Sequence, residues 1–234
     1  VIGLGEVGTA IQSILQCDGY DSRGMLVPTG GFDVLHICFP WSEDFVKNVV
    51  AYRNMFAKPG DLLVSLVIVH SSVPVGTCDT YGWAHSPVRG VHPNLEQGIR
   101  TFLKYFGGDR AHEAAEIFRA HGIICTAVNK ASSTEALKLW DTTQYGLMIL
   151  IQKEIHRWCE ENNVPFDLIY TDANHTYSIG YEALNRPEVV RPYLKHMPGP
   201  IGGHCVIPNA HLLSSPLTEL LIDFNTKLTL DQKP

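Results

Sequence analysis

The stretch that decides the fold is VIGLGEVGTAIQSIL, residues 1–15. An apolar segment runs directly into the pattern Gly3-x-Gly5-x-x-Gly8, and an amphipathic segment typical of a helix follows it. In a strand–turn–helix unit of this kind, the first glycine permits a tight turn and the second lets a pyrophosphate approach the backbone. The third lets the helix pack closely against the strand. The stretch therefore predicts a dinucleotide-binding fold, with phosphates on the free N–H groups of the helix N-terminus.

Strands and helices alternate along the rest of the first half. Apolar segments typical of buried strands are found at 32–40, 61–72 and 123–128. Segments typical of helices are found between them, at 42–57 and 110–122. This alternation predicts a parallel sheet with helices on both faces, in which ligands bind beyond the carboxyl ends of the strands. We therefore expect an α/β protein whose first 129 residues form a Rossmann-type, doubly wound dinucleotide-binding domain.

The cofactor residues follow from this placement. Those expected to contact it are Gly3, Gly5, Glu6, Val7, Gly8, Asp21, Phe39, Pro40 and Ser71. Asp21 is expected to hold the adenosine ribose, although it follows Gly8 by only 13 residues, against about 20 between glycines and acid in the usual pattern. Either the second strand is short or residues are missing between 17 and 31. A carboxylate here favours NAD, because the 2′-phosphate of NADP would meet a negative charge, while Arg23 leaves NADP open.

The second half is expected to form a helical domain, residues 130–234, built on one long helix at 132–162. That stretch contains no proline and a single glycine, Gly146. Ser132 and Glu135 have the spacing of a capping box at its start. At 1.5 Å per residue the helix would be on the order of 40 Å long, with enough apolar positions to contact two partners. We therefore expect it to be shared in a homodimer.

Composition narrows the class of protein. The net charge of −6 and the pI of about 6.0 argue against nucleic acid or an anionic membrane as the main partner. The longest apolar run, at 62–69, is too short to cross a bilayer, and no secretory leader is recognisable. The six cysteines are scattered with no C-x-x-C pair, which is typical of reduced thiols in a cytoplasmic protein. The eleven histidines show no H-E-x-x-H or comparable spacing, so no metal site is expected.

An unusual stretch near the end, PGPIGGHCVIPN at 198–209, places one cysteine in a glycine- and proline-rich loop. Together with VIGLGEVG, HICFP, HSSVPVGT (70–77) and EALKLWDTTQYGLMILIQKEI (135–155), it resembles the UDP-glucose/GDP-mannose dehydrogenase family. These segments occur in the order found in that family and span most of the chain. The most specific of them are SVPVG and GGHC.

The resemblance implies an NAD-dependent oxidation of a sugar alcohol to an aldehyde. A loop cysteine then captures the aldehyde as a thiohemiacetal, a second hydride transfer gives a thioester, and water releases the acid. By position, Cys205 matches the nucleophile and Lys138 the helix lysine that stabilises oxyanion charge. Ser72 stands where the family has a threonine near the nicotinamide. A nearby cation would also favour the thiolate form of a cysteine.

The departures from the family concern the later steps. Val88 and His92 stand where the family has glutamates that orient the hydrolytic water, and Asn209 replaces an aspartate. Thr142 stands in place of a frequent asparagine. The family's C-terminal nucleotide-sugar domain has no counterpart in these residues, and whether a partner chain supplies it is left open.

Three interpretations therefore stay open. The first is oxidation of the primary alcohol of a sugar or nucleotide-sugar-like substrate, with Cys205, Lys138, Ser72, Thr142 and Asn209 as the catalytic candidates. The second is a single-step dehydrogenase acting on a hydroxy acid or small sugar without a covalent intermediate. The third is a dimer that binds NAD and catalyses nothing. In the two enzymatic interpretations the partner is a small-molecule substrate.

Overall fold

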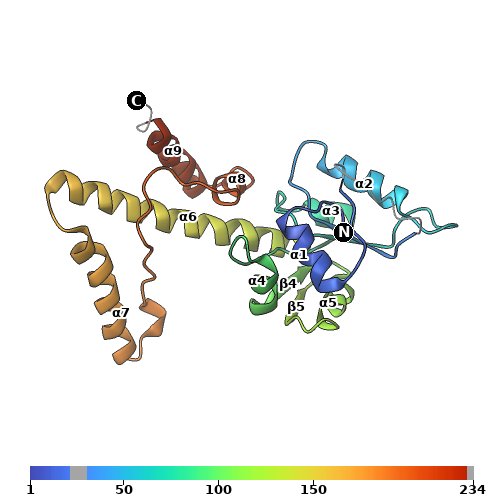
Figure 1. The fold of residues 1–234 in the computed structure, drawn as a ribbon, viewed down its shortest axis with the longest axis horizontal. Coiled ribbons are helices and arrows are strands. Elements are labelled where there is room, and N and C mark those ends of the chain that lie inside the picture. Colours follow the sequence, from blue (N-terminus) through green and yellow to red (C-terminus); the bar gives the residue numbers. More distant parts are fainter. Residues whose placement is uncertain (22–30, 231–234) are drawn as a thin grey trace. The chain divides into compact units, whose positions relative to one another are not determined.

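A computed structural model describes residues 1–21 and 31–230 (Figure 1). Arg23, which bears on the choice between NAD and NADP, lies outside the described residues. The chain divides into two compact units, Val1–Lys138 and Leu139–Pro234, called here the N-terminal unit and the C-terminal unit. The long helix begins in the first unit and continues into the second.

The N-terminal unit is a sheet covered by helices. Its strands, in the spatial order β1-β2-β3-β4-β5, are Val34–Ile37, Leu66–Val69, Ala84–His85, Lys104–Gly107 and Cys125–Val128. The pairs are parallel except β3–β4, which is antiparallel. Beyond β1, Ile2 pairs in parallel with Ile37 on one side and with Tyr20 on the other. The first segment of the chain therefore lies inside the sheet.

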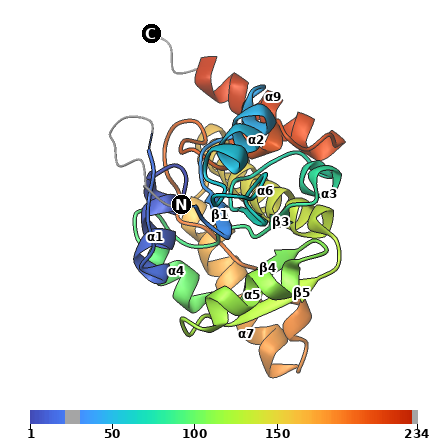
Figure 2. The same ribbon diagram turned by 90° about the vertical axis from the view of Figure 1, so that its right-hand side faces the viewer.

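Helices cover both faces of this sheet, as expected for a doubly wound fold. Their bounds are α1 Glu6–Leu15, α2 Phe45–Met55, α3 Thr77–Tyr81, α4 Leu95–Thr101 and α5 Ala111–Arg119. In Figure 2, α2 and α3 lie on one side of the strands and α5 on the other. The predicted strands and helices of this half are confirmed, with shorter bounds. Strand β4 runs antiparallel to β3, and β5, which pairs in parallel with β4, shares its direction. Strands β3 and β4 were not expected, because β3 has only two residues and the four residues of β4 begin with a lysine and end in a glycine.

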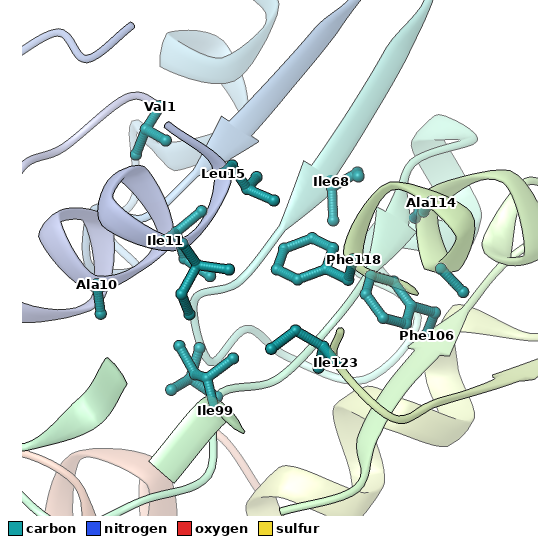
Figure 3. Packing of buried hydrophobic residues seen from close by; sticks show 14 of the residues in the cluster. Val1, Ala10, Ile11, Leu15, Ile68, Ile99, Phe106, Ala114, Phe118 and Ile123 are labelled. Carbon is teal, nitrogen blue, oxygen red and sulfur yellow. The ribbon is translucent and has the colours of Figure 1, made fainter. Parts of the chain in front are cut away.

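Alternation along the strands produces two separate cores. Leu66 and Ile68 of β2 pack in one cluster, which includes Ile11 of α1 and Phe118 of α5 (Figure 3). The alternate residues Val67 and Val69 face a second cluster, which includes Phe45 and Val49 of α2. A strand apolar on both faces is typical of a parallel sheet buried between helices.

The long helix α6 (Ala131–Asn162) is confirmed, but its start is not capped as predicted. The capping-box pairing of Ser132 with Glu135 is wrong. The carboxylate of Asp79 accepts hydrogen bonds from Ala131 N at 2.7 Å and Ser132 N at 3.1 Å. Glu135 instead accepts from the backbone N–H groups of Gly76 and Cys78 at 2.5 and 2.8 Å. The two helices α3 and α6 thus cap each other with carboxylates, since each N-terminus has orphan donors.

The C-terminal unit is helical. After α6 come a π-helical segment η1 (Asp167–Asp172), α7 (Ala173–Ala183), a 3₁₀ turn η2 (Pro187–Val189), α8 (Val206–Ala210) and α9 (Pro216–Leu230). A small cluster of buried residues, Ile201, Val206, Ala210 and Leu221, forms its core against α6 side chains such as Leu150.

Candidate active site

The glycine loop has the geometry that each of its glycines was expected to provide. Gly3 has φ +90°, which favours glycine. A Cβ on Gly8 would lie 1.8 Å from the Gly3 carbonyl oxygen, whereas a Cβ on Gly5 would have no atom within 4 Å. Gly3 and Gly8 are therefore required by the fold itself, and Gly5 leaves open space at the start of α1. Among the described residues, no side chain caps α1, so its first N–H groups, at Glu6, Val7 and Gly8, are in place to bind an anion.

Asp21 lies beside this loop. Its Oδ2 accepts a hydrogen bond from Leu4 N at 3.2 Å. The short spacing from Gly8 has a structural explanation, because α1 ends after ten residues and Gln16 turns the chain with φ +50°. Four residues later, Tyr20 pairs in parallel with Ile2 at the start of the chain. Within the described residues the expected second strand amounts to one bridge at Tyr20, and the adjacent Asp21 reaches the glycine loop.

An open cleft of about 800 Å³ adjoins the loop. Its walls come from the glycine loop with α1 and from α4 with the two residues before it. The lining residues are Leu4, Gly5, Glu6, Thr9, Ala10, Ser13, Pro93, Asn94, Glu96, Gln97 and Arg100. The Glu6 carboxylate contacts Nδ1 of His92. His92 therefore lies at the glycine loop and pairs with an acid.

The predicted residues after β1 and β2 meet at the carboxyl edge of the sheet. The Ser71 hydroxyl donates to the Phe39 carbonyl at 2.6 Å, and the Phe39 ring packs on Phe45 at 4.9 Å between centroids. Pro40 is exposed and Ser72 half-buried at the same edge. These residues line the end of the sheet that also carries the glycine loop.

Lys138 is held at this edge by the backbone. Its Nζ donates to the Val88 carbonyl at 3.0 Å, and Val88 lies three residues after the end of β3. The Val88 side chain is buried, with 7% exposed. The valine that replaces a family glutamate thus contributes no carboxylate and positions the lysine through its carbonyl oxygen. Sequence reasoning missed this contact because a backbone acceptor leaves no trace in residue type.

A buried polar cluster inside the sheet was also missed. His36 Nδ1 and His70 Nε2 are 3.1 Å apart, and the Lys104 Nζ lies 5.1 Å from the centre of the Phe118 ring. Burial lowers the pKa of His36 and His85 to about 3 and that of Lys104 to about 7. All three are therefore largely or partly neutral at pH 7. The sequence indicated this cluster only through polar residues, such as His36 and His70, within apolar segments typical of strands.

The remaining catalytic candidates lie in the C-terminal unit. Cys205 directly precedes α8 and is half-buried against the apolar cluster of that unit. Asn209 Nδ2 donates to the Thr142 hydroxyl at 3.2 Å, and both residues are buried. Thr142 in turn donates to the Leu139 carbonyl. Asn209 and Thr142 thus form a contact that attaches α8 to α6.

Three further observations concern the predicted site types. All six cysteines are described, and all are free thiols. Within residues 1–21 and 31–230, no group of three or more His, Cys, Asp or Glu side chains is arranged to hold a metal ion. Among the same residues, no helix is both long and apolar enough to span a membrane.

Comparison with known proteins gives similarity at the level of structure. No model of a known protein family matches the chain, and no curated protein matches its sequence. The structure is similar to a UDP-D-ManNAc dehydrogenase from Pyrococcus horikoshii, with a TM-score of 0.74 and 19% identity over 97% of this chain and 68% of that one. It is also similar to a UDP-N-acetyl-mannosamine dehydrogenase from Staphylococcus aureus, with a TM-score of 0.64 and 17% identity over 98% of this chain and 66% of that one.

A third similar structure is a Mycobacterium tuberculosis 3-hydroxyisobutyrate dehydrogenase, with a TM-score of 0.63 and 15% identity. The match covers 98% of this chain and 92% of that one. At such identities the similarity establishes the fold. The chain has the Rossmann-type fold with a following helical unit that these dehydrogenases share, in agreement with the UDP-glucose/GDP-mannose dehydrogenase-like motifs of its sequence.

Proposed function

We propose that this chain is an NAD(P)-dependent oxidoreductase that oxidises a CH–OH group of a small molecule. The observation that carries the proposal is the Lys138 ammonium, held 3.0 Å from the Val88 carbonyl at the sheet edge that also bears the glycine loop. A cation fixed there can stabilise an alkoxide as hydride leaves the adjoining carbon. A protein that only binds a nucleotide has no use for such a group.

The residues present fit a dinucleotide. In this proposal the open space beside Gly5 takes the pyrophosphate and the first N–H groups of α1 donate to it. Asp21, whose carboxylate lies beside Leu4 of the glycine loop, is the proposed acceptor for the ribose diol. The carboxylate favours NAD over NADP. When bound, the nicotinamide supplies the hydride acceptor. The protein's part is to orient the alcohol and to hold the charge that develops on its oxygen.

For the substrate we propose the primary alcohol of a sugar or nucleotide-sugar-like compound, with Cys205 as the nucleophile that captures the aldehyde. In that step the thiolate sulfur bonds to the carbonyl carbon, and the carbonyl oxygen takes up a proton. A second oxidation would remove the hydride of the thiohemiacetal carbon and the proton of its hydroxyl, and a nicotinamide bound in the dinucleotide site would supply the hydride acceptor. The resulting thioester on Cys205 would be cleaved by water to the acid and the free thiol. The named dehydrogenases of nucleotide sugars among the similar structures support this class of substrate.

A second candidate is a single-step dehydrogenase of a hydroxy acid or small sugar. It is favoured by the buried Val88 in place of a glutamate, because a valine side chain cannot orient a hydrolytic water. The structural match to 3-hydroxyisobutyrate dehydrogenase, which covers 92% of that chain, supports this candidate as well. In this case Cys205 does not react.

The test is NADH formation, followed by absorbance, with a panel of sugar alcohols, nucleotide sugars and 3-hydroxy acids. Lys138→Met should abolish turnover with every substrate that the wild type oxidises, while NAD affinity is kept. Lys47→Met is the matched control, since Lys47 is exposed on α2 and pairs with Asp44 at the surface. Binding of NAD without NADH formation on the whole panel would leave the non-catalytic interpretation standing.

Cys205→Ser separates the two chemistries. A four-electron oxidation should stop at one NADH for each substrate molecule, with aldehyde released. A single-step dehydrogenase should keep most of its turnover and its yield of one NADH.

We propose that two copies of the chain associate through α6 to form a homodimer. Trp140, Ile151 and Trp158 are 43%, 54% and 49% exposed. Their spacings of 11 and 7 residues are close to three and two full helical turns, so the three side chains share one face of α6. Large exposed apolar stripes of this kind are typical of protein–protein contacts.

A further inference from the structure

The position of Cys205 depends on how the two ends of a short segment are held. Ile201 and Val206 are both buried in the apolar cluster of the C-terminal unit, and only residues 202–205 separate them. A Cβ on Gly202 or Gly203 would have no atom within 4 Å. The intervening glycines thus have open space around them, and the anchors at either end determine where the sulfur lies.

The downstream anchor is the packing contact of α8 with α6. A Cβ on Gly146 would lie 2.6 Å from Val206 Cγ1 and 2.7 Å from Leu221 Cδ2, so only glycine lets α8 approach so closely. The Asn209–Thr142 hydrogen bond adds a polar interaction to the same packing contact.

The upstream anchor is made by two side chains on different helices. Asn225 of α9 accepts a hydrogen bond from Ile201 N at 2.5 Å and donates to Ile201 O at 3.4 Å. Lys153 of α6 donates from its ammonium to the carbonyls of Met197 and Gly199, at 2.5 and 2.6 Å. Together they hold three backbone positions of the segment that leads to Cys205.

Lys153 is a buried lysine on α6, a helix that also carries many exposed residues. Its side chain is 7% exposed, and burial lowers the pKa of its ammonium. A buried ammonium must be satisfied by hydrogen bonds, and here backbone carbonyls of one loop provide them. A point charge that draws two carbonyls toward itself fixes the backbone between them.

We propose that Lys153 and Asn225 are positioning residues, which clamp the loop 197–201 so that the Cys205 thiol is presented in one place. The proposal rests on the proposed role of Cys205, but the clamp can be tested without substrate or cofactor. Neither residue touches the reacting atoms in this scheme. Both act through the backbone that carries the cysteine.

The test is the rate at which iodoacetamide alkylates Cys205 in the full chain, measured by mass spectrometry of peptides, with the other five cysteines as internal references. Asn225→Ala and Lys153→Met should each raise the Cys205 rate several-fold. Asn225→Asp keeps the acceptor for Ile201 N, and Lys153→Arg keeps a cation with several donors, so both should stay near the wild-type rate. Lys227→Met, an equal charge change at an exposed position of α9, is the matched control.

Hydrogen exchange at the Ile201 amide gives a second readout, because that N–H is bonded to Asn225. It should exchange faster in Asn225→Ala, even if Lys153→Met fails to fold. Wild-type alkylation and exchange rates in folded Asn225→Ala would overturn the clamp. Faster alkylation in a protein that forms no NADH on the substrate panel would uphold the clamp and refute the proposed reaction instead.

Discussion

At the scale of single residues, the three glycines of the first turn are not equivalent. Gly5→Val should leave the fold intact, because a Cβ there has no neighbour within 4 Å and its φ of −73° suits any residue. It should abolish NAD binding by blocking the pyrophosphate. Titration calorimetry with NAD, together with thermal unfolding, measures both effects.

The matched variant is Gly8→Ala, whose methyl group would overlap the Gly3 carbonyl at 1.8 Å. We expect it to lower the free energy of unfolding by about 2 kcal/mol or more, as overpacking against backbone does. Undiminished NAD affinity in Gly5→Val would show that the cofactor binds elsewhere.

The buried Lys104 predicts an alkaline dependence of stability. Its folded pKa is about 7 against 10.5 in the unfolded chain. Between these values the unfolded state binds a proton that the folded state does not. The free energy of unfolding of the N-terminal unit should therefore rise from pH 7 toward pH 10.5, by up to about 1.4 kcal/mol per pH unit for this one proton. Hydrogen exchange of the most protected β2 amides measures it at each pH.

Lys104→Met should remove that slope, and Lys47→Met should keep it. The histidines act in a different window, since His36 and His85 have folded pKa values of about 3 against 6.5. Their contribution is lost as the pH falls from 6.5 toward 3. An identical alkaline slope in Lys104→Met and wild type would contradict the assignment of the slope to this ammonium.

At the scale of elements, the mutual capping of α3 and α6 joins two helices that are distant in sequence. Glu135→Gln should lower the free energy of unfolding by about 2 kcal/mol, because an amide can accept only one of the two backbone hydrogen bonds that the carboxylate accepts. Asp79→Ala should cost about 1 kcal/mol as a lost cap. Urea unfolding of each variant gives these values.

The control for the capping variants is Glu161→Gln, at the far end of α6, where the carboxylate pairs with Arg157 on the surface. Its effect should stay within about 0.5 kcal/mol. Equal losses in Glu135→Gln and Glu161→Gln would mean that the capping contacts contribute nothing beyond ordinary surface charge.

At the scale of the whole molecule, the exposed stripe of α6 predicts a dimer. Light scattering at micromolar concentration should give about twice the chain mass of 26.0 kDa. Ile151→Asp combined with Trp158→Asp should give a monomer, because charges replace the apolar face. Leu62→Asp, at a 93% exposed position outside α6, should remain dimeric. A monomeric wild type would reject the predicted dimer.

The sequence by itself determined the class of fold, because its signals are local. Glycine spacing, apolar strand segments and a long stretch with a single glycine report on backbone geometry within a few residues, and the structure has these elements where the patterns predicted them. Strands β3 and β4 were not predicted from the sequence, because segments of two and four residues are too short to show a strand periodicity.

Only the tertiary structure decided which groups meet. Lys138 reaches the carbonyl of a residue 50 positions away, and Asn209 bonds a threonine 67 positions away. Glu135 caps α3 across 57 positions, where local spacing had paired it with Ser132. Such partners are set by how packed helices and strands bring distant backbone together, and a carbonyl acceptor and an N–H donor are present at nearly every residue. No local pattern can therefore single it out.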